Sequence, residues 1–249
     1  MRVMEVRLLS ETIDKPELLT AYEEALIQAR AEDNIPDTIW VLKIPKCVYL
    51  CRNASLLYIN TEYAGKNGYP LCRSSVFCGA PMSAAVHEYG YSLFYVGKYD
   101  FANYCDQIVT PFWNQYLPIE LNQSFDLIIP NTDRKIGGAV PFKDGDVYFS
   151  SPYFTEIAPD LDLGTLFILP PEKFAGKTIQ DIYGRVTSYF TETGNKLDYN
   201  EILNSFKKFL ENKNIITDFG ILSEYELKLV NDLSAKYLSD DWIKYAKSD

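Results

Sequence analysis

A lysine followed directly by small residues is the part of this sequence best suited to chemistry. Asp126 stands in the apolar run 125–129, and the run 133–139 then reads Asp-Arg-Lys-Ile-Gly-Gly-Ala, with the lysine at position 135. Glycine leaves the backbone uncovered, so a phosphate or carbonyl group can approach closely, and a fixed ammonium stabilises negative charge that develops there. By spacing alone, a plainer interpretation is favoured, in which Arg134 and Lys135 are solvated turn residues and the glycines only shape a hairpin.

The elements expected to position this lysine are mostly strands in the first two thirds of the chain and helices in the last third. Strands are predicted at 38–43, 46–51, 69–74, 91–96, 125–129, 135–141, 146–151 and 166–169, and helices at 18–31, 62–67, 99–117, 179–189, 199–212 and 223–237. In the first helix, Glu23, Glu24 and Gln28 fall opposite the apolar face. Strands followed by helices, without regular alternation, predict an α+β fold. No repeat or long linker interrupts the chain, so residues 1–249 are expected to form one domain.

Composition and charge narrow the classes of function. The 249 residues carry a formal net charge of −10, which disfavours a surface that neutralises nucleic-acid phosphates. No run of about 18 apolar residues is present, so no membrane span is expected. The first residues lack the apolar run of a signal peptide, and the cysteines are odd in number, so reduced thiols in the cytoplasm are the simpler expectation.

Metal binding finds little support in the sequence. Cys47 and Cys51 are four residues apart in an expected strand, which separates them by roughly 13 Å and prevents them from sharing one ion. His87 is the single histidine and lies in another segment. Any Ser-His-Asp or Cys-His site would therefore depend on His87, which is more simply interpreted as a structural hydrogen-bonding residue.

The run 133–139 resembles the lysine motif of the lipoate–protein ligase family. Further segments are similar to the family in the same order: 21–26 in the first helix, then 160–162, 169–174 and 185–186, and finally 222–242 at the closing helix. The resemblance thus spans most of the chain. It implies the catalytic-domain fold of biotin/lipoate protein ligases, an α+β fold with a mixed, largely antiparallel sheet flanked by helices.

The resemblance also implies a two-step reaction. ATP activates a small carboxylic acid such as lipoate or octanoate as an acyl adenylate, and a lysine of a lipoyl-carrier protein or domain then takes the acyl group. Lys135 falls on the family's catalytic lysine, and Asp126 on an aspartate near the nucleotide that can hold Mg²⁺. Gly137, Gly138 and Ala139 would let the adenylate pass close to the backbone.

The acyl-binding loop departs from the family pattern. Arg73 matches the first of two arginines and is implied to bind the nucleotide, but Ser74 stands at the second. Pro81-Met82-Ser83 replaces three glycines, which adopt positive φ freely. Ser83 and His87 are the implied substrate-binding residues of the loop. Phe125 stands where asparagine is usual, and the His-Gly pair common further along the family is missing at 148–151.

Three functions remain open. The first is the ATP-dependent acyl–protein ligase, and the second is an octanoyl or lipoyl transferase that needs no ATP. Cys78 would be the candidate nucleophile of a thioester route, but related octanoyltransferases carry their cysteine after the lysine motif, whereas all five cysteines here precede Lys135. The third is a non-catalytic family member that binds a carrier protein. The family's accessory domain is not visible after Trp242, so activity could require an accessory subunit.

Overall fold

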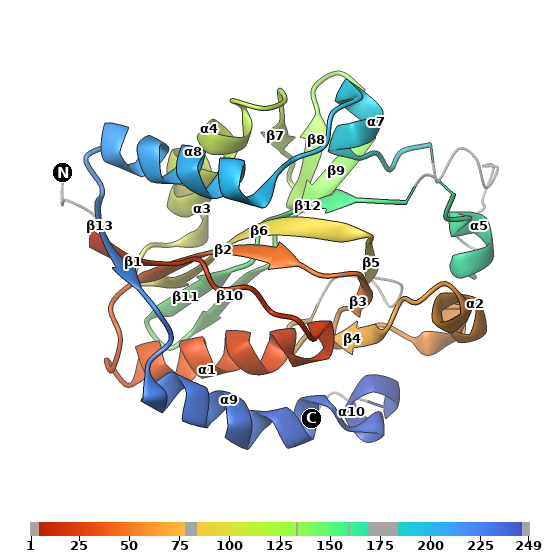
Figure 1. The fold of residues 1–249 in the computed structure, drawn as a ribbon, viewed down its shortest axis with the longest axis horizontal. Coiled ribbons are helices and arrows are strands. Elements are labelled where there is room, and N and C mark those ends of the chain that lie inside the picture. Colours follow the sequence, from red (N-terminus) through yellow and green to blue (C-terminus); the bar gives the residue numbers. More distant parts are fainter. Residues whose placement is uncertain (1–4, 78–83, 133, 159, 169–183, 246–249) are drawn as a thin grey trace.

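The chain folds into a large sheet between two layers of helices, as the computed structural model in Figure 1 shows. The structure describes residues 5–77, 84–132, 134–158, 160–168 and 184–245. The strands are β1 (Glu5–Leu9), β2 (Thr38–Ile44), β3 (Cys47–Leu50), β4 (Leu71–Arg73), β5 (Ala84–His87), β6 (Tyr89–Gly97), β7 (Glu120–Leu121), β8 (Asp126–Ile129), β9 (Arg134–Gly138), β10 (Pro141–Asp144), β11 (Val147–Ser150), β12 (Tyr153–Glu156) and β13 (Ile216–Gly220). The helices are α1 (Leu19–Ala31), α2 (Thr61–Lys66), α3 (Phe101–Tyr104), α4 (Thr110–Trp113), α5 (Leu163–Leu166), α7 (Tyr189–Thr193), α8 (Tyr199–Asn212), α9 (Glu224–Tyr237) and α10 (Asp240–Tyr245), with short 3₁₀ turns η1 (Pro16–Leu18) and η2 (Leu56–Tyr58) and a π-helical segment η3 (Cys105–Val109).

Two sheets organise these strands within the described part of the chain. The main sheet follows the path β13-β1-β2-β6-β12-β9-β8-β7, with β11 paired to β6 and β10 paired to β11, and a smaller sheet has the order β4-β3-β5. In the main sheet β1 is parallel to both β13 and β2, and the other pairs are antiparallel. In the smaller sheet, β3 and β4 are parallel. The prediction of an α+β fold with a mixed, largely antiparallel sheet is confirmed.

Helix α1 is covered on two sides. Leu19, Leu26 and Ile27 join the core beneath the main sheet, whereas Ala21 and Ala25 pack against α9. Figure 1 shows α1 and α9 side by side below the sheet. Alanine side chains are short, so the two helix axes can approach closely. As a result α1 is buried both on the side of the sheet and on the side of α9.

The other face of the sheet is covered by α3, η3, α4 and α8 (Figure 1). Phe112 packs edge-on against Phe206 of α8, with ring centroids 4.9 Å apart, and Trp113 stacks on Phe154 of β12 at 4.1 Å. The sequence predicts one helix over 99–117, but the structure divides it at η3, just before Pro111. Proline lacks an N–H and clashes with the carbonyl four residues earlier, which accounts for the widened turn at this point.

Two other sequence predictions of elements are corrected. Of the predicted strand 166–169, residue 169 lies outside the described residues, and the rest is replaced by the end of α5 and a single bridge from Phe167 to Ile59. Of the predicted helix 179–189, residues 179–183 lie outside the described residues, and 184–188 form a turn and a bridge at Val186 instead. The strands that were not predicted are β1, β5, β7, β10, β12 and β13. Conversely, the predicted end of α1 and both ends of α8 are confirmed, as is the capping box of Ser223 and Glu226 at the start of α9.

A buried ion pair connects the first strand to the last layer of helices. Arg7 of β1 donates from Nη1 and Nη2 to the Glu226 carboxylate at 2.9 and 2.5 Å. Glu226 also accepts from the backbone N–H and the hydroxyl of Ser223, each at 2.7 Å. The carboxylate therefore fixes the start of α9 and its position against β1 at the same time.

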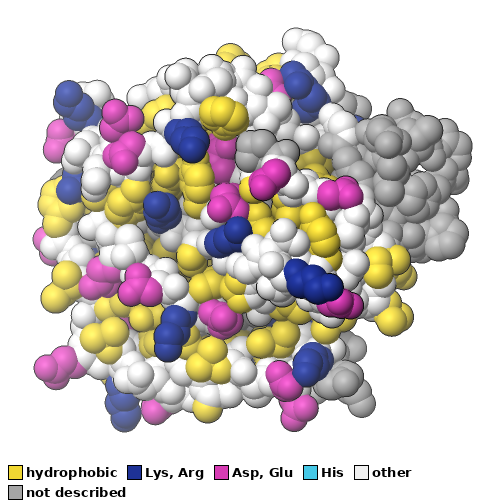
Figure 2. Space-filling view, turned by 45° about the vertical axis from the view of Figure 1, so that its right-hand side comes forward, with side chains coloured by type: hydrophobic (Ala, Val, Ile, Leu, Met, Phe, Trp, Pro, Cys, Tyr) yellow, Lys and Arg dark blue, Asp and Glu magenta, His cyan; other side chains and the backbone are white. Residues whose placement is uncertain are grey.

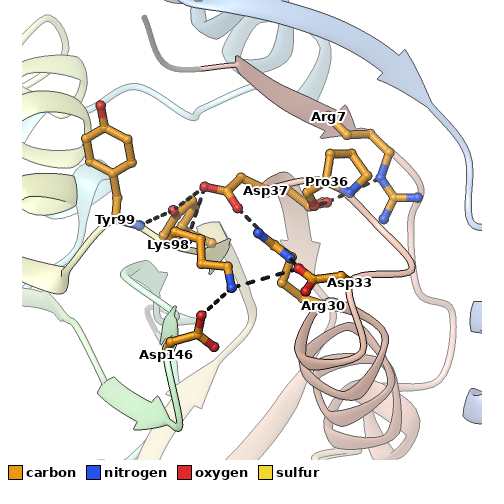
Figure 3. Close-up of polar contacts among 10 residues, drawn as sticks. Arg7, Arg30, Asp33, Pro36, Asp37, Lys98, Tyr99 and Asp146 are labelled. Carbon is orange, nitrogen blue, oxygen red and sulfur yellow. Dashed lines mark hydrogen bonds and ion pairs between the residues drawn. The ribbon is translucent and has the colours of Figure 1, made fainter. Parts of the chain in front are cut away.

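A second cluster of charges joins the end of α1 to the neighbouring strands (Figure 3). Arg30 donates from Nε to Asp37 at 2.9 Å and from Nη1 to Asp33 at 2.5 Å. Lys98 lies between Asp33 and Asp146, and pairs with both. The Arg30–Asp37 pair is largely shielded from solvent, so it contributes more to the connection than the exposed pairs of Lys98, which are screened by water and salt.

Charged side chains of both signs are interspersed on the face shown in Figure 2, between patches of exposed hydrophobic side chains. Among the described residues, no helix is long and apolar enough to cross a membrane.

Candidate functional site

The backbone of Lys135 is fixed from both sides of β9. On one side Lys135 faces Ile128 of β8. On the other side its N–H donates to the carbonyl of Arg185 at 2.6 Å, and its carbonyl accepts from the N–H of Thr187 at 2.8 Å. Segment 185–187 therefore extends the sheet beside the lysine, next to the edge of β12.

Helix α7 holds segment 185–187 in this place. Glu192 of α7 pairs with the Arg134 guanidinium at 2.8 Å and accepts a hydrogen bond from the Thr187 hydroxyl. One carboxylate thus ties the residue before the lysine to the segment that borders it. Arg134 is therefore a structural residue in this fold rather than a solvated turn residue.

The Lys135 side chain forms an ion pair with Asp126. Lys135 Nζ lies 2.7 Å from Asp126 Oδ1, and the side chains of Lys135 and Asp126 are 40% and 32% exposed. Burial opposes the lysine's charge, but Tyr153 and Asp126 outweigh that effect and raise the pKa of Lys135 above its ordinary value. Lys135 is accordingly a fixed cation at pH 7 and not a proton acceptor.

Two cavities meet at Lys135. The smaller, of about 160 Å³, is mostly apolar, and the larger measures about 500 Å³. Lys135 and Tyr153 border both of them. The smaller cavity is further lined by Ala84, Ala85, Val86, Ile136, Gly137, Thr155, Ile157, Leu163, Phe167, Val186 and Thr187. The larger cavity is further lined by Glu23, Tyr49, Cys51, Ser74, Val76, Phe77, Ala84, Ala85, Ser124, Phe125, Asp126, Gly138, Ala139, Val140, Pro141, Phe149 and Ser151.

The small residues after the lysine serve the sheet as well as the cavities. Gly137 lines the smaller cavity, and Gly138 and Ala139 line the larger one. A Cβ on Gly137 would lie 1.9 Å from the backbone carbonyl oxygen of Tyr153, because β12 passes directly across it. A Cβ on Gly138 would approach the Tyr153 ring no closer than 3.2 Å. The first glycine is therefore required by strand packing, whether or not a ligand is bound.

We expect the two glycines to respond differently to alanine. Gly137→Ala forces β9 and β12 apart and should destabilise the protein by about 1–3 kcal/mol, the usual cost of overpacking. Gly138→Ala requires only a small shift of a tyrosine ring and should cost less than 1 kcal/mol. Urea unfolding of the two variants measures the difference, and equal losses of stability would contradict the packing argument.

Arg73 does not reach either cavity. Its Nε donates to the carbonyl of Ile243 at 2.9 Å, and its Nη1 contacts the carbonyls of Cys51, Arg52 and Ala54 at 3.0, 2.9 and 2.7 Å. These bonds tie β4 to α10 and to the turn after β3. These contacts give Arg73 a structural role, and its predicted contact with a nucleotide stays a prediction.

Of the other residues predicted in the acyl-binding loop, the structure describes His87. Ser83 and Cys78 lie outside the described residues. His87 is buried in β5, lines neither cavity, and has its ring edge-on to Tyr153 with centroids 5.4 Å apart. Burial lowers the pKa of His87 to about 3, so the imidazole is neutral at pH 7. It contacts the site through Tyr153 and through the Thr155 hydroxyl, which lies 3.4 Å from Nδ1.

Asp126 is the predicted metal ligand. Among the described residues, no group of three or more His, Cys, Asp or Glu side chains could hold a metal ion. Mg²⁺ commonly takes one or two carboxylates together with substrate phosphates. A single carboxylate fits that mode, with Asp126 as the protein ligand and a nucleotide supplying the remaining oxygens.

The cysteines differ from the expectation of reduced thiols. Cys51 is disulfide-bonded, which contradicts that prediction at this position. Cys47, Cys72 and Cys105 are free, buried and absent from the lining of both cavities. None of these three thiols is placed to attack a ligand beside Lys135.

Two residues that border the larger cavity were not singled out from sequence. Glu23 of α1 is 1% exposed and accepts a hydrogen bond from the Tyr49 hydroxyl at 2.9 Å. Burial raises the pKa of Glu23 to about 7. One sequence signal could have revealed this pair. The helix that carries Glu23 is rich in alanine on another side, which indicates a helix packed against neighbours on two sides.

Comparison with solved structures identifies the fold that carries this site. Neither a protein-family model nor a curated protein matches the sequence. A bi-partite lipoate protein ligase from Thermoplasma acidophilum, described with its E2 lipoyl domain, is similar over 99% of this chain and 98% of its own, at 20% identity and a TM-score of 0.76. Lipoate-protein ligase A bound with ATP gives 17% identity and a TM-score of 0.72 over 99% of this chain and 100% of its own. LipL1 of P. falciparum in complex with lipoate gives 13% identity and a TM-score of 0.69, over 98% of this chain and 75% of its own.

The chain has the fold of the lipoate–protein ligases. This confirms, at the level of the fold, the resemblance drawn from the lysine motif and the segments around it. The similar structures match nearly all of the chain, from β1 to the C-terminal helices.

Proposed function

We propose that this protein is an ATP-dependent acyl–protein ligase that forms an acyl adenylate and transfers the acyl group to a lysine of a carrier protein. The observation that carries the proposal is the position of Lys135, a fixed cation at the meeting point of two cavities. A ligase of this kind must bring an acid and a nucleotide phosphate to one point, and a cation there stabilises the charge of the transition state.

The two cavities suit the two halves of an acyl adenylate. The smaller cavity offers apolar side chains and the hydroxyls of Thr155 and Thr187, a lining suited to a flat base. The larger one accommodates an acyl chain that extends from Lys135. The carboxylate of the acid would lie beside the Lys135 ammonium. There it would attack the α-phosphate of ATP, and pyrophosphate would leave. Asp126 would hold Mg²⁺ or polar groups of the nucleotide, because one protein carboxylate together with phosphate oxygens is a usual set of Mg²⁺ ligands.

Names of the similar proteins support the choice of substrates. One is described with an E2 lipoyl domain, one with ATP and one with lipoate. We therefore propose ATP and a lipoate-like carboxylic acid as substrates and a lipoyl-carrier domain as acceptor. Because one of these proteins is described as bi-partite, the proposal includes a second chain that completes the activity.

ATP–pyrophosphate exchange tests this proposal directly. Purified protein with ATP, Mg²⁺ and labelled pyrophosphate is supplied with lipoate, octanoate or biotin in turn. We expect exchange that depends on one of the acids. No exchange with any acid, also in the presence of a carrier domain, would reject adenylation by the chain on its own. Exchange without any added acid would reject the acyl substrate.

A further inference from the structure

The lining of the larger cavity includes a group of polar side chains. On the side of α1, its lining includes Glu23, Tyr49, Ser74 and Ser151. Most of their polar atoms are already engaged: the Tyr49 hydroxyl contacts Thr20 at 3.2 Å and donates to Glu23 Oε2 at 2.9 Å, the Ser74 hydroxyl accepts from the Val76 N–H at 3.1 Å, and the Ser151 hydroxyl contacts that of Ser92 at 3.3 Å.

One polar atom of this group is left without a partner. Glu23 Oε1 is buried and completes no hydrogen bond with any described residue. The Ser151 hydroxyl faces the same carboxyl group and lowers its pKa, but less than burial raises it. A buried carboxyl oxygen without a partner is costly, because it has lost water and gained nothing in return. Such an atom beside a cavity indicates a ligand that supplies the missing bond.

We infer that the acid bound in the larger cavity carries a hydrogen-bond donor, such as an amide or ureido N–H, at the end away from its carboxylate. This inference rests on the proposed function, because it assumes that the carboxylate pairs with Lys135. The acyl chain then runs from β9 toward α1, and its far end meets Glu23. A wholly aliphatic acid would leave Oε1 unpaired and also displace water from it.

Glu23 is thus a specificity-determining residue and takes no part in the chemical step. Its carboxyl accepts from an N–H when ionised and can additionally donate when protonated, so an amide-like group satisfies it in either state. A ligand with a terminal carboxylate would place two acidic groups together and bind poorly. The lining therefore separates three acids of equal length by their far end alone: octanoate, suberate and suberic acid monoamide.

Calorimetric titration of octanoate and suberic acid monoamide, with a non-hydrolysable ATP analogue present, tests the inference without needing turnover. We expect the monoamide to bind wild-type protein about tenfold more tightly, the effect of one satisfied hydrogen bond. Glu23→Leu should reverse the preference, whereas Glu23→Gln, which can still hydrogen-bond an amide, should keep it. Glu24→Gln removes a charge from the adjacent residue, which lines neither cavity, and should leave the preference unchanged.

The outcomes separate this inference from the proposed function. Octanoate binding as tightly as the monoamide, together with octanoate-dependent exchange, would overturn the role of Glu23 and leave the ligase intact. If neither octanoate nor the monoamide binds and no acid supports exchange, the role of Glu23 and the proposed ligase function are both overturned. If Glu23→Leu does not fold, the comparison of wild type with Glu23→Gln and Glu24→Gln still decides, because a missing preference in wild type is sufficient to reject the inference.

Discussion

Lys135→Ala is expected to lower the rate of acyl-adenylate formation by about 10²–10³-fold or more, the usual loss when one preorganised group that stabilises the transition state is removed. The ammonium is the single group that borders both cavities and carries a fixed positive charge among their described lining residues. Its side chain is 40% exposed, so the fold should survive its removal. Pyrophosphate exchange gives the rate, and circular dichroism verifies the fold.

Lys143→Ala is the matched control for this prediction. Lys143 lies on the exposed hairpin strand β10 and lines neither cavity, so its removal deletes the same charge without touching the site. Lys135→Arg should remain impaired as well, because the planar guanidinium cannot occupy the place of the ammonium beside Asp126. Full activity in Lys135→Ala would remove the central support of the proposed function.

The second large effect concerns stability. Arg7→Met should destabilise the protein by about 3–5 kcal/mol, since it leaves the Glu226 carboxylate buried without its countercharge. The double variant Arg7→Met/Glu226→Leu should recover much of that loss. Lys66→Met, which removes one partner of the exposed Lys66–Glu62 pair, should cost less than about 0.5 kcal/mol. Urea unfolding at neutral pH compares all three, and a loss from Arg7→Met no larger than that from Lys66→Met would contradict the prediction.

This ion pair also predicts a dependence of stability on pH. Burial acts to raise the pKa of Glu226, but Arg7 and Ser223 outweigh it, so the pKa lies below its ordinary value. The unfolded state therefore takes up the proton first as the pH falls, and the stabilisation present at neutral pH is lost as the pH falls through the folded-state pKa. Glu226→Gln should flatten this acid-side slope of the unfolding free energy, and an unchanged slope would show that other carboxyls set it.

Local sequence signals predicted the long helices α1, α8 and α9 well and several strands less well. The end of α1, both ends of α8 and the capped start of α9 follow from apolar spacing and from Ser223 with Glu226. By contrast, β13 is short and is stabilised by pairing with β1, more than 200 residues away in the chain. No local pattern contains that partner, so the pattern indicates only helices in this part of the chain.

The site illustrates the same limit in its individual residues. The lysine motif located Lys135, Asp126 and the glycines at the cavities, because their role depends on adjacent backbone. Arg73 matched the first arginine of the acyl-binding loop, yet its partners include the carbonyl of Ile243, 170 residues later. Glu23 was assigned to the solvent face, because helical periodicity alone does not reveal that Tyr49 of β3 and the larger cavity lie beside it.

Phe125 departs from the family pattern at a cost that sequence alone does not show. Its φ is +60°, in the left-handed region that asparagine tolerates and that costs a residue such as phenylalanine about 1–2 kcal/mol. The ring packs edge-on against Phe101, with centroids 4.9 Å apart, and borders the larger cavity. The strained backbone is retained where it shapes the wall next to Asp126.

Strand β1 lies between β2 and β13, and its Arg7 pairs with Glu226 of α9. During synthesis on the ribosome, β1 and α1 leave the exit tunnel long before the strand and helix that cover them. At about 5–20 residues per second, the nascent chain carries an open strand edge and an uncompensated guanidinium for on the order of ten to forty seconds. Chaperones that recognise extended apolar segments therefore have their longest opportunity to bind at the N-terminal hundred residues, and release is favoured once the final helices emerge.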